Sequence, residues 1–515
     1  MQMRNLDLEP TAQPRAGRWW ALAALVVSGL VIALDSTVLI TALPTLSQKL
    51  GATTSDLQWI AAAYTLALGS LLLPGGVLGD RYGRKLLLIV GLVLFGVASV
   101  AASQTTSAAG LIAMRALMGV GAALVLPLSL AILPSLFSEV ERPRAVSAAA
   151  AGAFLGLPLG PLVAGWLLTH YAWGSVFLIN APVVVLAVVG VWFLVPESKD
   201  PHPRAFDWVG GLLAVIGVTA LVYGVIDQPI HGWTDTRVLG GIIGGAIVLA
   251  AFILWDIRHP SPFVDLRNFR NRSFTWSTVA FVMTGFALFG VMFILTPYIQ
   301  IVLGNDAQAT GVKLLPLIGG VIAGAGIGNL LAARLGVRIG VSFGLLVAAG
   351  GLVIFSRAGS DTGYGLVAAA LAVIGVGIGI ALPTSLDIII GVLPPGQTGA
   401  GSALTRALQQ IAASFGVAIL GSVLNNVYQS NLAPHVVGLP AAARDLAQGS
   451  IAGAAAVAAH LPPAVGAPLA RAAKGAYIAG LGDVMIVSAA LMVLTAIAIG
   501  IFLPSRATKM EDRES

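Results

Sequence analysis

Long apolar stretches recur along the whole chain, separated by short polar segments. Most of them run for about 20 residues, which as a helix is enough to cross a hydrocarbon core of roughly 30 Å. The first stretch follows Arg15 and Arg18 and is too long for the core of a signal peptide, so we expect it to be retained as a span. The pattern predicts fourteen membrane spans, at 19–43, 57–77, 86–103, 109–132, 146–169, 175–195, 208–226, 239–256, 274–300, 310–333, 338–357, 364–392, 400–425 and 480–503.

The composition supports this interpretation. Charged residues make up 10% of the chain, against about 25% in an ordinary soluble domain. Hydrophobic residues make up 57%, and the mean hydropathy is +0.92. A soluble enzyme, a nucleic-acid-binding protein and a disordered chain are therefore all unlikely classes. The sequence predicts an all-α integral membrane protein that contacts the lipid bilayer on most sides.

The positive charges indicate the orientation. The net charge is +6, and cytoplasmic loops carry the excess of Lys and Arg in membrane proteins. Basic residues gather after even-numbered spans, at Arg81, Arg84, Lys85, Arg258, Arg267, Arg270 and Arg272. We therefore expect a multi-pass protein of a bacterial cytoplasmic (inner or plasma) membrane, with both termini in the cytoplasm.

Several kinds of chemistry have no sequence support. The chain has no cysteine, and its six histidines include no pair four residues apart, so we predict no disulfide and no metal site. No Lys follows a Gly, which excludes the GxxxxGK[ST] loop that cradles nucleotide phosphates. We expect no catalytic residues, no cofactor and no nucleotide. If the protein pumps, an ion gradient or a partner must drive it.

Charges inside predicted spans are costly and mark candidate functional positions. Asp35 lies roughly 24 Å along a helix from Trp19, deep in the bilayer, and should face either Arg115 or water. Arg115 lies within span 4, where it has a function or simply extends its charge to the interface. Asp387 near the end of span 12 is a second protonation site or an interfacial residue. Gln409 and Gln410 on span 13 are candidates for hydrogen bonds to cargo.

Two glycine-rich passages suggest close packing and an internal repeat. GVLGDRYGRK at 76–85 leads from span 2 to span 3, and the weakly similar NLLAARLGVR at 329–338 leads from span 10 to span 11. Two six-span halves separated by an inserted pair explain that offset, and such repeats are typical of secondary transporters. We predict a bundle over 1–206, an inserted helix pair over 207–257 and a second bundle over 258–515.

Span 5 and the last long loop are the remaining features. Gly152, Gly156 and Gly160 recur every four residues and form a ridge that lets another helix approach closely. Pro158 and Pro161 bend the helix, and the Gly-rich span 10 is the expected partner. Between spans 13 and 14, the segment 426–478 is rich in Ala and Pro and is predicted to be a long extracellular loop. It has either a lid-like function or none.

These passages resemble the major facilitator superfamily over nearly the whole chain. The loop with Gly76, Asp80, Gly83 and Arg84 is similar to the family's G-x-L-a-D-r-x-G-r-k, which implies a latch between the two halves in the outward-facing state. Span 4, through Arg115, Gly119, Gly121 and Ala123, resembles R-x-x-x-G-x-g-a-A, with Met118 in place of the usual Gln. Gly156, Gly160, Pro161 and Gly165 resemble the antiporter motif of span 5, although Ala164 departs from it.

A narrower resemblance is to the fourteen-span drug:proton antiporters of this superfamily. ALDSTVLITALP at 33–44 is similar to their span-1 motif through Asp35, Thr37, Ala42, Leu43 and Pro44, and Trp173, Phe177, Asn180 and Pro182 resemble a second motif. Gln300 fits their passage from span 9 to span 10. The resemblance implies proton coupling through Asp35, Arg115 and Asp387, and a substrate cavity with Asp35, Gln300, Gln409 and Gln410.

The implied function is proton-coupled export of amphipathic, often cationic compounds by a monomer. Two other functions stay open at this point. One is a dedicated exporter of a single metabolite, lipid or antibiotic. The other is a membrane protein that binds or senses a compound without transporting it.

Overall fold

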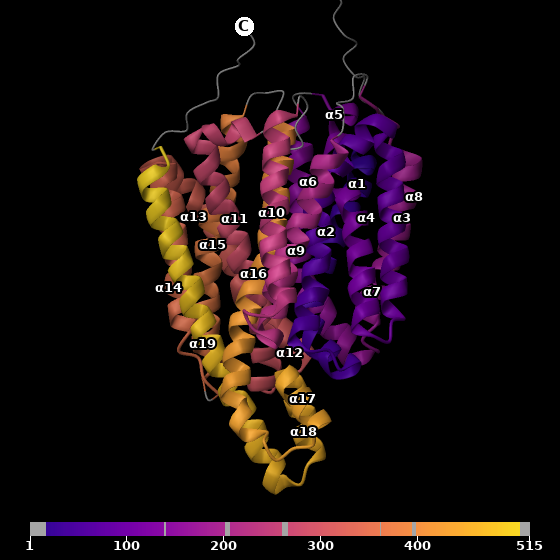
Figure 1. Cartoon of the computed structure of the whole chain (residues 1–515). Coiled ribbons are helices and arrows are strands. Elements are labelled where there is room, and N and C mark those ends of the chain that lie inside the picture. Colours follow the sequence, from indigo (N-terminus) through magenta and orange to yellow (C-terminus); the bar gives the residue numbers. More distant parts are fainter. Residues whose placement is uncertain are drawn as a thin grey trace, which may run out of the picture.

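A computed structural model describes residues 17–138, 141–200, 207–259, 266–360, 362–393 and 398–504. Its regular elements are helices that run nearly parallel from one end of the molecule to the other (Figure 1). α1 begins and α19 ends at one end, which we call the terminal end. A helical hairpin, α17 and α18, projects from the opposite end, which we call the hairpin end.

The first bundle contains six long helices and two short ones. Their bounds are α1 Arg18–Leu50, α2 Thr54–Tyr82, α3 Arg84–Ser103, α4 Ala108–Ala131 with its continuation α5 Leu133–Leu136, α6 Arg142–His170, and α8 Asn180–Leu194 preceded by α7 Ser175–Leu178. The inserted pair is α9 Trp208–His231 and α10 Thr236–Arg258.

The second bundle begins with the 3-10 turn η1 and ends with the longest helix of the chain. Its elements are η1 Leu266–Arg270, α11 Arg272–Pro297, the π-helical turn η2 Tyr298–Val302, α12 Ala307–Lys313, α13 Leu315–Leu335, α14 Val337–Phe355, α15 Tyr364–Val392, α16 Thr398–Leu432, η3 Ala433–His435, α17 Ala441–Gly449, α18 Ile451–His460 and α19 Pro463–Phe502.

The fourteen predicted spans are confirmed. Thirteen stretches among the described residues are long and apolar enough to cross a membrane. The fourteenth is α6, a helix of 29 residues that packs along α1 in the first bundle. In the most apolar segment of α10 only 17% of the residues are buried in the protein, so most of this helix faces lipid.

Local sequence signals explain where helices begin and end. Thr53 and Asp56 form a capping box at the start of α2, in which each side chain accepts a hydrogen bond from the other residue's backbone N–H. Gly83 joins α2 to α3 with φ 124°, and Gly336 joins α13 to α14 with φ 86°. Both values favour glycine, so the two passages of the predicted repeat share a turn at equivalent positions.

The segment 426–478, predicted as a long loop between spans 13 and 14, is mostly helical. α16 continues to Leu432, α19 already begins at Pro463, and α17 and α18 form the hairpin between them. Alanine is the best helix former, and proline is tolerated in the first turn of a helix. The Ala- and Pro-rich composition that suggested a loop therefore suits helices, and Pro440 and Pro462 precede the starts of the short α17 and of the long α19.

The two bundles meet along a seam that involves α2 and α16. The side-chain amide of Gln58 donates to the carbonyl oxygens of Val417 and Ala418 at 3.2 and 2.8 Å, and the hydroxyls of Thr65 and Ser414 lie 2.6 Å apart. α9 packs against both α2 and α16. The inserted pair therefore covers the seam from the lipid side.

Candidate functional site: a buried ion pair and the contacts between bundles

A buried ion pair links α1 to α4. Nη1 of Arg115 lies 2.5 Å from Oδ2 of Asp35, and each side chain is only 1% exposed. The Arg115 guanidinium also lies over the ring of Tyr64, 4.2 Å from the ring centroid, and its Nε donates to the carbonyl oxygen of Ile60. Of the two surroundings expected for Asp35, the structure has the arginine.

The second carboxylate oxygen of Asp35 is held by a chain of hydrogen bonds. The Asn180 amide donates to Oδ1 of Asp35 and to the hydroxyl of Ser99, both at 3.0 Å. The Ser99 hydroxyl donates to the carbonyl oxygen of Phe177 at 2.8 Å. Asn180 and Ser99 are fully buried. Both carboxylate oxygens of Asp35 therefore have hydrogen-bonding partners, one from α4 and one from α8.

This network lies inside the first bundle. All its members belong to α1, α2, α3, α4, α7 and α8. Asp35 is buried, so it has no open surface with which to contact a substrate in this conformation. Oδ1 of Asn180 is buried without a hydrogen bond to a described group, which leaves hydrogen-bonding capacity beside the ion pair.

The predicted cavity glutamines do not lie together. Gln300 lies in η2, where its amide donates to the carbonyl oxygen of Thr41 at 2.8 Å and bridges the two bundles. It lines a cavity of about 280 Å³ with Gln48, Asn305 and others. Gln409 packs against Gly285 of α11, which is roughly 20 Å along that helix from Gln300. Gln410 lies beside Gly69 of α2 at the seam.

The second intramembrane acid has a different environment from Asp35. Asp387 on α15 is exposed, and no ion pair or hydrogen bond joins it to another residue in the described part of the chain. Its carboxylate is therefore accessible in this conformation. The structure leaves open both of the roles expected for it.

The loop between α2 and α3 makes its polar contacts within the first bundle. Oδ1 of Asp80 accepts from Nε of Arg84 at 2.8 Å, and the Asp80 carbonyl oxygen accepts from the backbone N–H of Asp200. Glu197 accepts from the backbone N–H groups of Lys85 and Leu86 at the start of α3 and lies against Gly83. Neither Asp80 nor Arg84 bonds to a described residue of the second bundle, so the latch remains a prediction for another conformation.

Gly156 and Gly160 of the span-5 ridge pack against α1 in this conformation, and span 5 meets the predicted span 10 at the start of that span, in α12. A Cβ on Gly156 would lie 2.7 Å from the Cβ of Ala33, and one on Gly160 would overlap the hydroxyl of Thr37 at 1.8 Å. The glycines of α13 instead pack against α15. The surroundings of Gly152 and Pro158 lie outside the described residues.

Among the described residues of α6, those near the hairpin end contact the second bundle. A Cβ on Gly165 would lie 2.6 Å from the Cα of Gln308, and one on Gly311 would lie 2.3 Å from the carbonyl oxygen of Pro161. Gly165 and Pro161 of the antiporter motif therefore contact α12, whereas Gly156 and Gly160 fix the shape of their own bundle.

The bundles are bonded together at the hairpin end and along the seam. Bridging hydrogen bonds run from Gln300 to Thr41, between Ser47 and Ser450, and from Thr54 to Gly449. Toward the terminal end, where Asp80 and Arg84 lie, no hydrogen bond or ion pair between described residues joins the two bundles. The structure is therefore closed at the hairpin end and free of such bonds at the terminal end.

The sequence analysis did not identify three groups that form polar contacts at or between these sites. Ser99 has no signal in the sequence, because a buried Ser in an apolar span looks like any small residue. Glu197 follows the last span of the first bundle and gives no hint that it caps α3. Ser47 and Ser450 lie far apart in the sequence, and only the position of the hairpin brings them together.

Two bundles with an inserted pair, a charged loop after α2 and a buried ion pair together define a membrane transporter rather than an enzyme. The family model of the Major Facilitator Superfamily matches residues 25–417. The chain belongs to this superfamily.

Several known proteins are about one-third identical to the chain, and the similarity covers nearly its full length. It is 32% identical to the multidrug efflux pump LfrA of Mycolicibacterium smegmatis, covering 94% of this chain and 96% of that protein. It is 32% identical to the tetracenomycin C resistance and export protein of Streptomyces glaucescens, with 96% and 93% covered. It is 31% identical to the methyl viologen resistance protein SmvA of Salmonella typhimurium, with 90% and 93% covered.

Solved structures agree on the fold. A bacterial homologue of the human lysosomal transporter Spinster superimposes with a TM-score of 0.64 at 15% identity, covering 96% of this chain and 99% of that one. A D-xylose-proton symporter superimposes with a TM-score of 0.60 at 14% identity, covering 96% and 100%.

Proposed function

We propose that the protein is a proton-coupled antiporter that exports amphipathic, often cationic compounds across a bacterial cytoplasmic membrane by alternating access. The relatives named for multidrug efflux, drug export and methyl viologen resistance support the cargo class. In this proposal the protein acts as a monomer, the terminal end faces the cytoplasm and the hairpin end faces outward. The basic residues of the terminal end agree with that orientation.

The buried pair of Asp35 and Arg115 carries the proposal. An ion pair in the membrane is stable only while both charges are present, and an unpaired buried charge costs several kcal/mol. A proton that reaches Asp35 neutralises one partner and leaves Arg115 to find another. Protonation therefore favours a different arrangement of α1 and α4, which is what a coupling device needs.

The driving force depends on the charge of the cargo. One elementary charge crossing 100 mV supplies about 2.3 kcal/mol, or a concentration ratio of roughly fiftyfold, which one proton provides for a neutral cargo. A singly charged cation that leaves in exchange for one proton moves no net charge, so in that case the pH difference or a second proton must drive export. No nucleotide is needed in this scheme. The proton gradient takes the place of a cofactor.

The structure corresponds to one stage of the proposed cycle. With the hairpin end closed, cargo would enter from the cytoplasm, and Asp387 on α15 is accessible in this state. Rocking of the two bundles would then open the hairpin end. The loop with Asp80 and Arg84 would latch the terminal end in that second state.

The test is Asp35→Asn in protein reconstituted into vesicles with an imposed pH gradient. Uptake of ethidium and of methyl viologen reports transport, and a pH-sensitive dye reports protons. We expect the variant to lose drug-driven proton movement at least tenfold, because its amide cannot titrate. Asp387→Asn, the matched control, should show a smaller effect. Near-normal exchange of protons for drug in Asp35→Asn would assign coupling to another group.

A second function is favoured by the names of some relatives. The tetracenomycin C protein and a probable actinorhodin transporter of Streptomyces coelicolor are each named for one compound, so a dedicated exporter is the alternative. A panel of structurally unrelated cations, neutral antibiotics and lipids in the same vesicles separates the two. Transport of a single member would favour dedicated export.

A further inference from the structure

The hairpin formed by α17 and α18 belongs to the second bundle by sequence but is bonded to the first. It connects α16 to α19 and lies beyond the ends of the other helices (Figure 1). The Tyr428 hydroxyl of α16 donates to the carbonyl oxygen of Ala447 at 2.8 Å, which ties the hairpin to its own bundle. Its other contacts lead across the gap between the bundles.

Two hydrogen bonds fasten the hairpin to α1 and α2, and we call them the clasp. The hydroxyls of Ser450 and Ser47 lie 2.8 Å apart, and both side chains are buried. The Thr54 hydroxyl donates to the carbonyl oxygen of Gly449 at 2.9 Å. Because the partners belong to different bundles, both bonds must break before the bundles can separate at this end.

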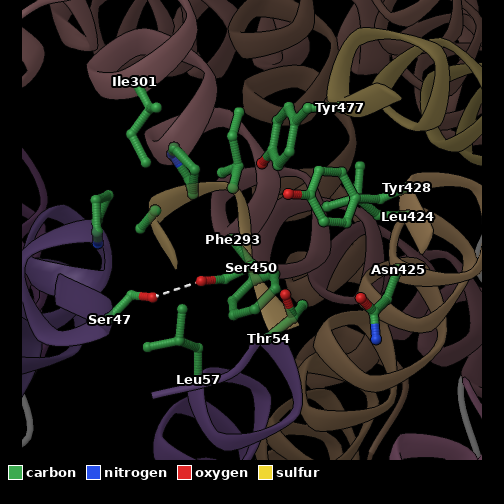
Figure 2. A pocket seen from close by; sticks show the side chains of 14 residues that line it. Ser47, Thr54, Leu57, Phe293, Ile301, Leu424, Asn425, Tyr428, Ser450 and Tyr477 are labelled. Carbon is green, nitrogen blue, oxygen red and sulfur yellow. Dashed lines mark hydrogen bonds between the residues drawn. The ribbon is translucent and has the colours of Figure 1, made fainter. Parts of the chain in front are cut away.

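A small chamber adjoins the clasp, because Ser47, Thr54 and Ser450 are among its lining residues (Figure 2). Its volume is about 30 Å³, room for only a few water molecules. Helices of both bundles and the hairpin line it, and most of the lining is apolar or aromatic, including Leu57, Phe293, Tyr428 and Tyr477. The chamber therefore lies at the hairpin end, between the two bundles and the hairpin.

One polar group in this chamber lacks a partner. Asn425 on α16 is 3% exposed, and its Oδ1 is buried with no hydrogen bond to a described group. The other polar side chains are bonded, since Tyr477 donates to the carbonyl oxygen of Ile294 and Ser450 is in the clasp. A buried amide oxygen without a partner is costly, so it is a ready acceptor for a donor on a ligand.

We propose that the α17–α18 hairpin is the lid of an exit-side binding site, in which opening of the clasp widens the chamber and Asn425 accepts a hydrogen bond from the departing cargo. This inference rests on the proposed export function. The ligand class is a flat apolar or cationic molecule that carries an N–H or O–H donor. Compounds without such a donor pass the same site with no bond to Asn425.

A disulfide across the clasp tests the lid. The chain has no cysteine, so Ser47→Cys with Ser450→Cys introduces the only two thiols, and side chains whose hydroxyls touch are close enough for a disulfide. After oxidation, we expect ethidium export to fall at least tenfold while ethidium binding by the detergent-solubilised protein is retained. Reduction should restore export. The matched controls are the two single-cysteine variants under the same oxidant, which should export normally.

The outcomes separate this inference from the proposed function. If the fully cross-linked protein exports ethidium at the rate of the reduced protein, the lid is wrong although the exporter stands. If the protein without cysteine substitutions exports none of the compounds, the proposed export function is wrong, and the lid that rests on it is wrong as well. Mass spectrometry of the cross-linked peptide establishes that the disulfide has formed.

A second measurement covers the case in which the double-cysteine variant does not fold. Asn425→Cys places a single thiol in the chamber, and a membrane-impermeant maleimide applied from outside reports its accessibility. Removing the clasp with Thr54→Val and Ser450→Ala should raise the labelling rate severalfold. The control is Ser430→Ala, which removes an exposed hydroxyl of α16 that bonds only within its own helix. Equal labelling with and without the clasp would overturn the lid.

The ligand class is tested with two cations that differ in hydrogen-bond donors. Ethidium carries two amino groups, whereas methyl viologen has no N–H or O–H. Asn425→Leu keeps the approximate shape and removes the acceptor. Since one hydrogen bond is worth about 1 kcal/mol, we expect ethidium export to fall about fivefold relative to methyl viologen export. An equal change for both compounds would show that Asn425 does not contact the cargo.

Discussion

At the scale of single residues, each buried charge of the first bundle is compensated by neighbouring side chains. Arg115 is among the largest fully buried side chains, and its charge is compensated by Asp35 and by the face of Tyr64. Asn180 completes the environment of Asp35 from α8. Each member is satisfied only in the presence of the others, so the network responds as a unit to the loss of any charge.

This coupling predicts the stability of charge variants. Asp35→Asn leaves the Arg115 guanidinium buried and unpaired, so it should lower the free energy of unfolding by about 3 kcal/mol. Adding Arg115→Gln removes the second charge and should recover a large part of that loss. Thermal unfolding of the purified single and double variants measures both. Additive losses in the double variant would contradict a direct ion pair.

At the scale of helices, glycine positions decide which elements approach closely. Gly160 is one of the contacts that bring α6 against α1, where a side chain would overlap Thr37. In α10, by contrast, a methyl group on Gly240 or Gly244 would meet no heavy atom of a neighbouring element within 4 Å. Glycine therefore has a packing role at Gly160 and none at these two positions, whereas Gly241 and Gly245 of the same α10 lie tightly against α9.

Substitution by alanine distinguishes these two situations. Gly160→Ala should destabilise the protein by about 1–3 kcal/mol, because α1 and α6 must move apart. Gly240→Ala is the matched control and should be neutral or slightly stabilising, since alanine favours the helix. Thermal unfolding in detergent compares the two. A neutral Gly160→Ala would mean that Thr37 can turn aside without moving its helix.

At the scale of the whole molecule, polar contacts between bundles are distributed unevenly. They lie at the hairpin end and along α2 and α16, while the loop with Asp80 bonds only within its own half. A transporter that alternates must exchange one set of contacts for another. The latch of Asp80 and Arg84 stays a prediction for a state in which the terminal end closes.

The predicted latch should affect the rate of transport and not the affinity for the substrate. Asp80→Asn should lower the rate of ethidium transport about tenfold, because the outward-facing state loses polar contacts that hold it. Ethidium affinity of the solubilised protein should stay within about twofold. Equilibrium binding and vesicle transport measure the two quantities separately. Parallel loss of both would place Asp80 in the substrate path.

The sequence determines the spans and the family but not the contacts between distant segments. Stretches of about 20 apolar residues leave few alternatives to a membrane helix, and the fourteen spans follow. The partnership of Asp35 with Arg115 could be anticipated because each buried charge needs the other. The hairpin was missed because its alanines lie outside the membrane, where composition alone does not separate a helix from a loop. Its bond to Ser47 depends on packing that no local pattern reports.

The length of α19 has a mechanical consequence. Its 40 residues span about 60 Å, twice the thickness of the hydrocarbon core, so the part beyond the membrane works as a lever arm. A tilt of about 10° around the middle of the helix swings its outer tip by roughly 5 Å. Such a swing exceeds the reach of the bond between Ser47 and Ser450. If the hairpin is the proposed lid, the rocking of the second bundle would reach the clasp through α19, whose outer part contains Pro468 within the helix.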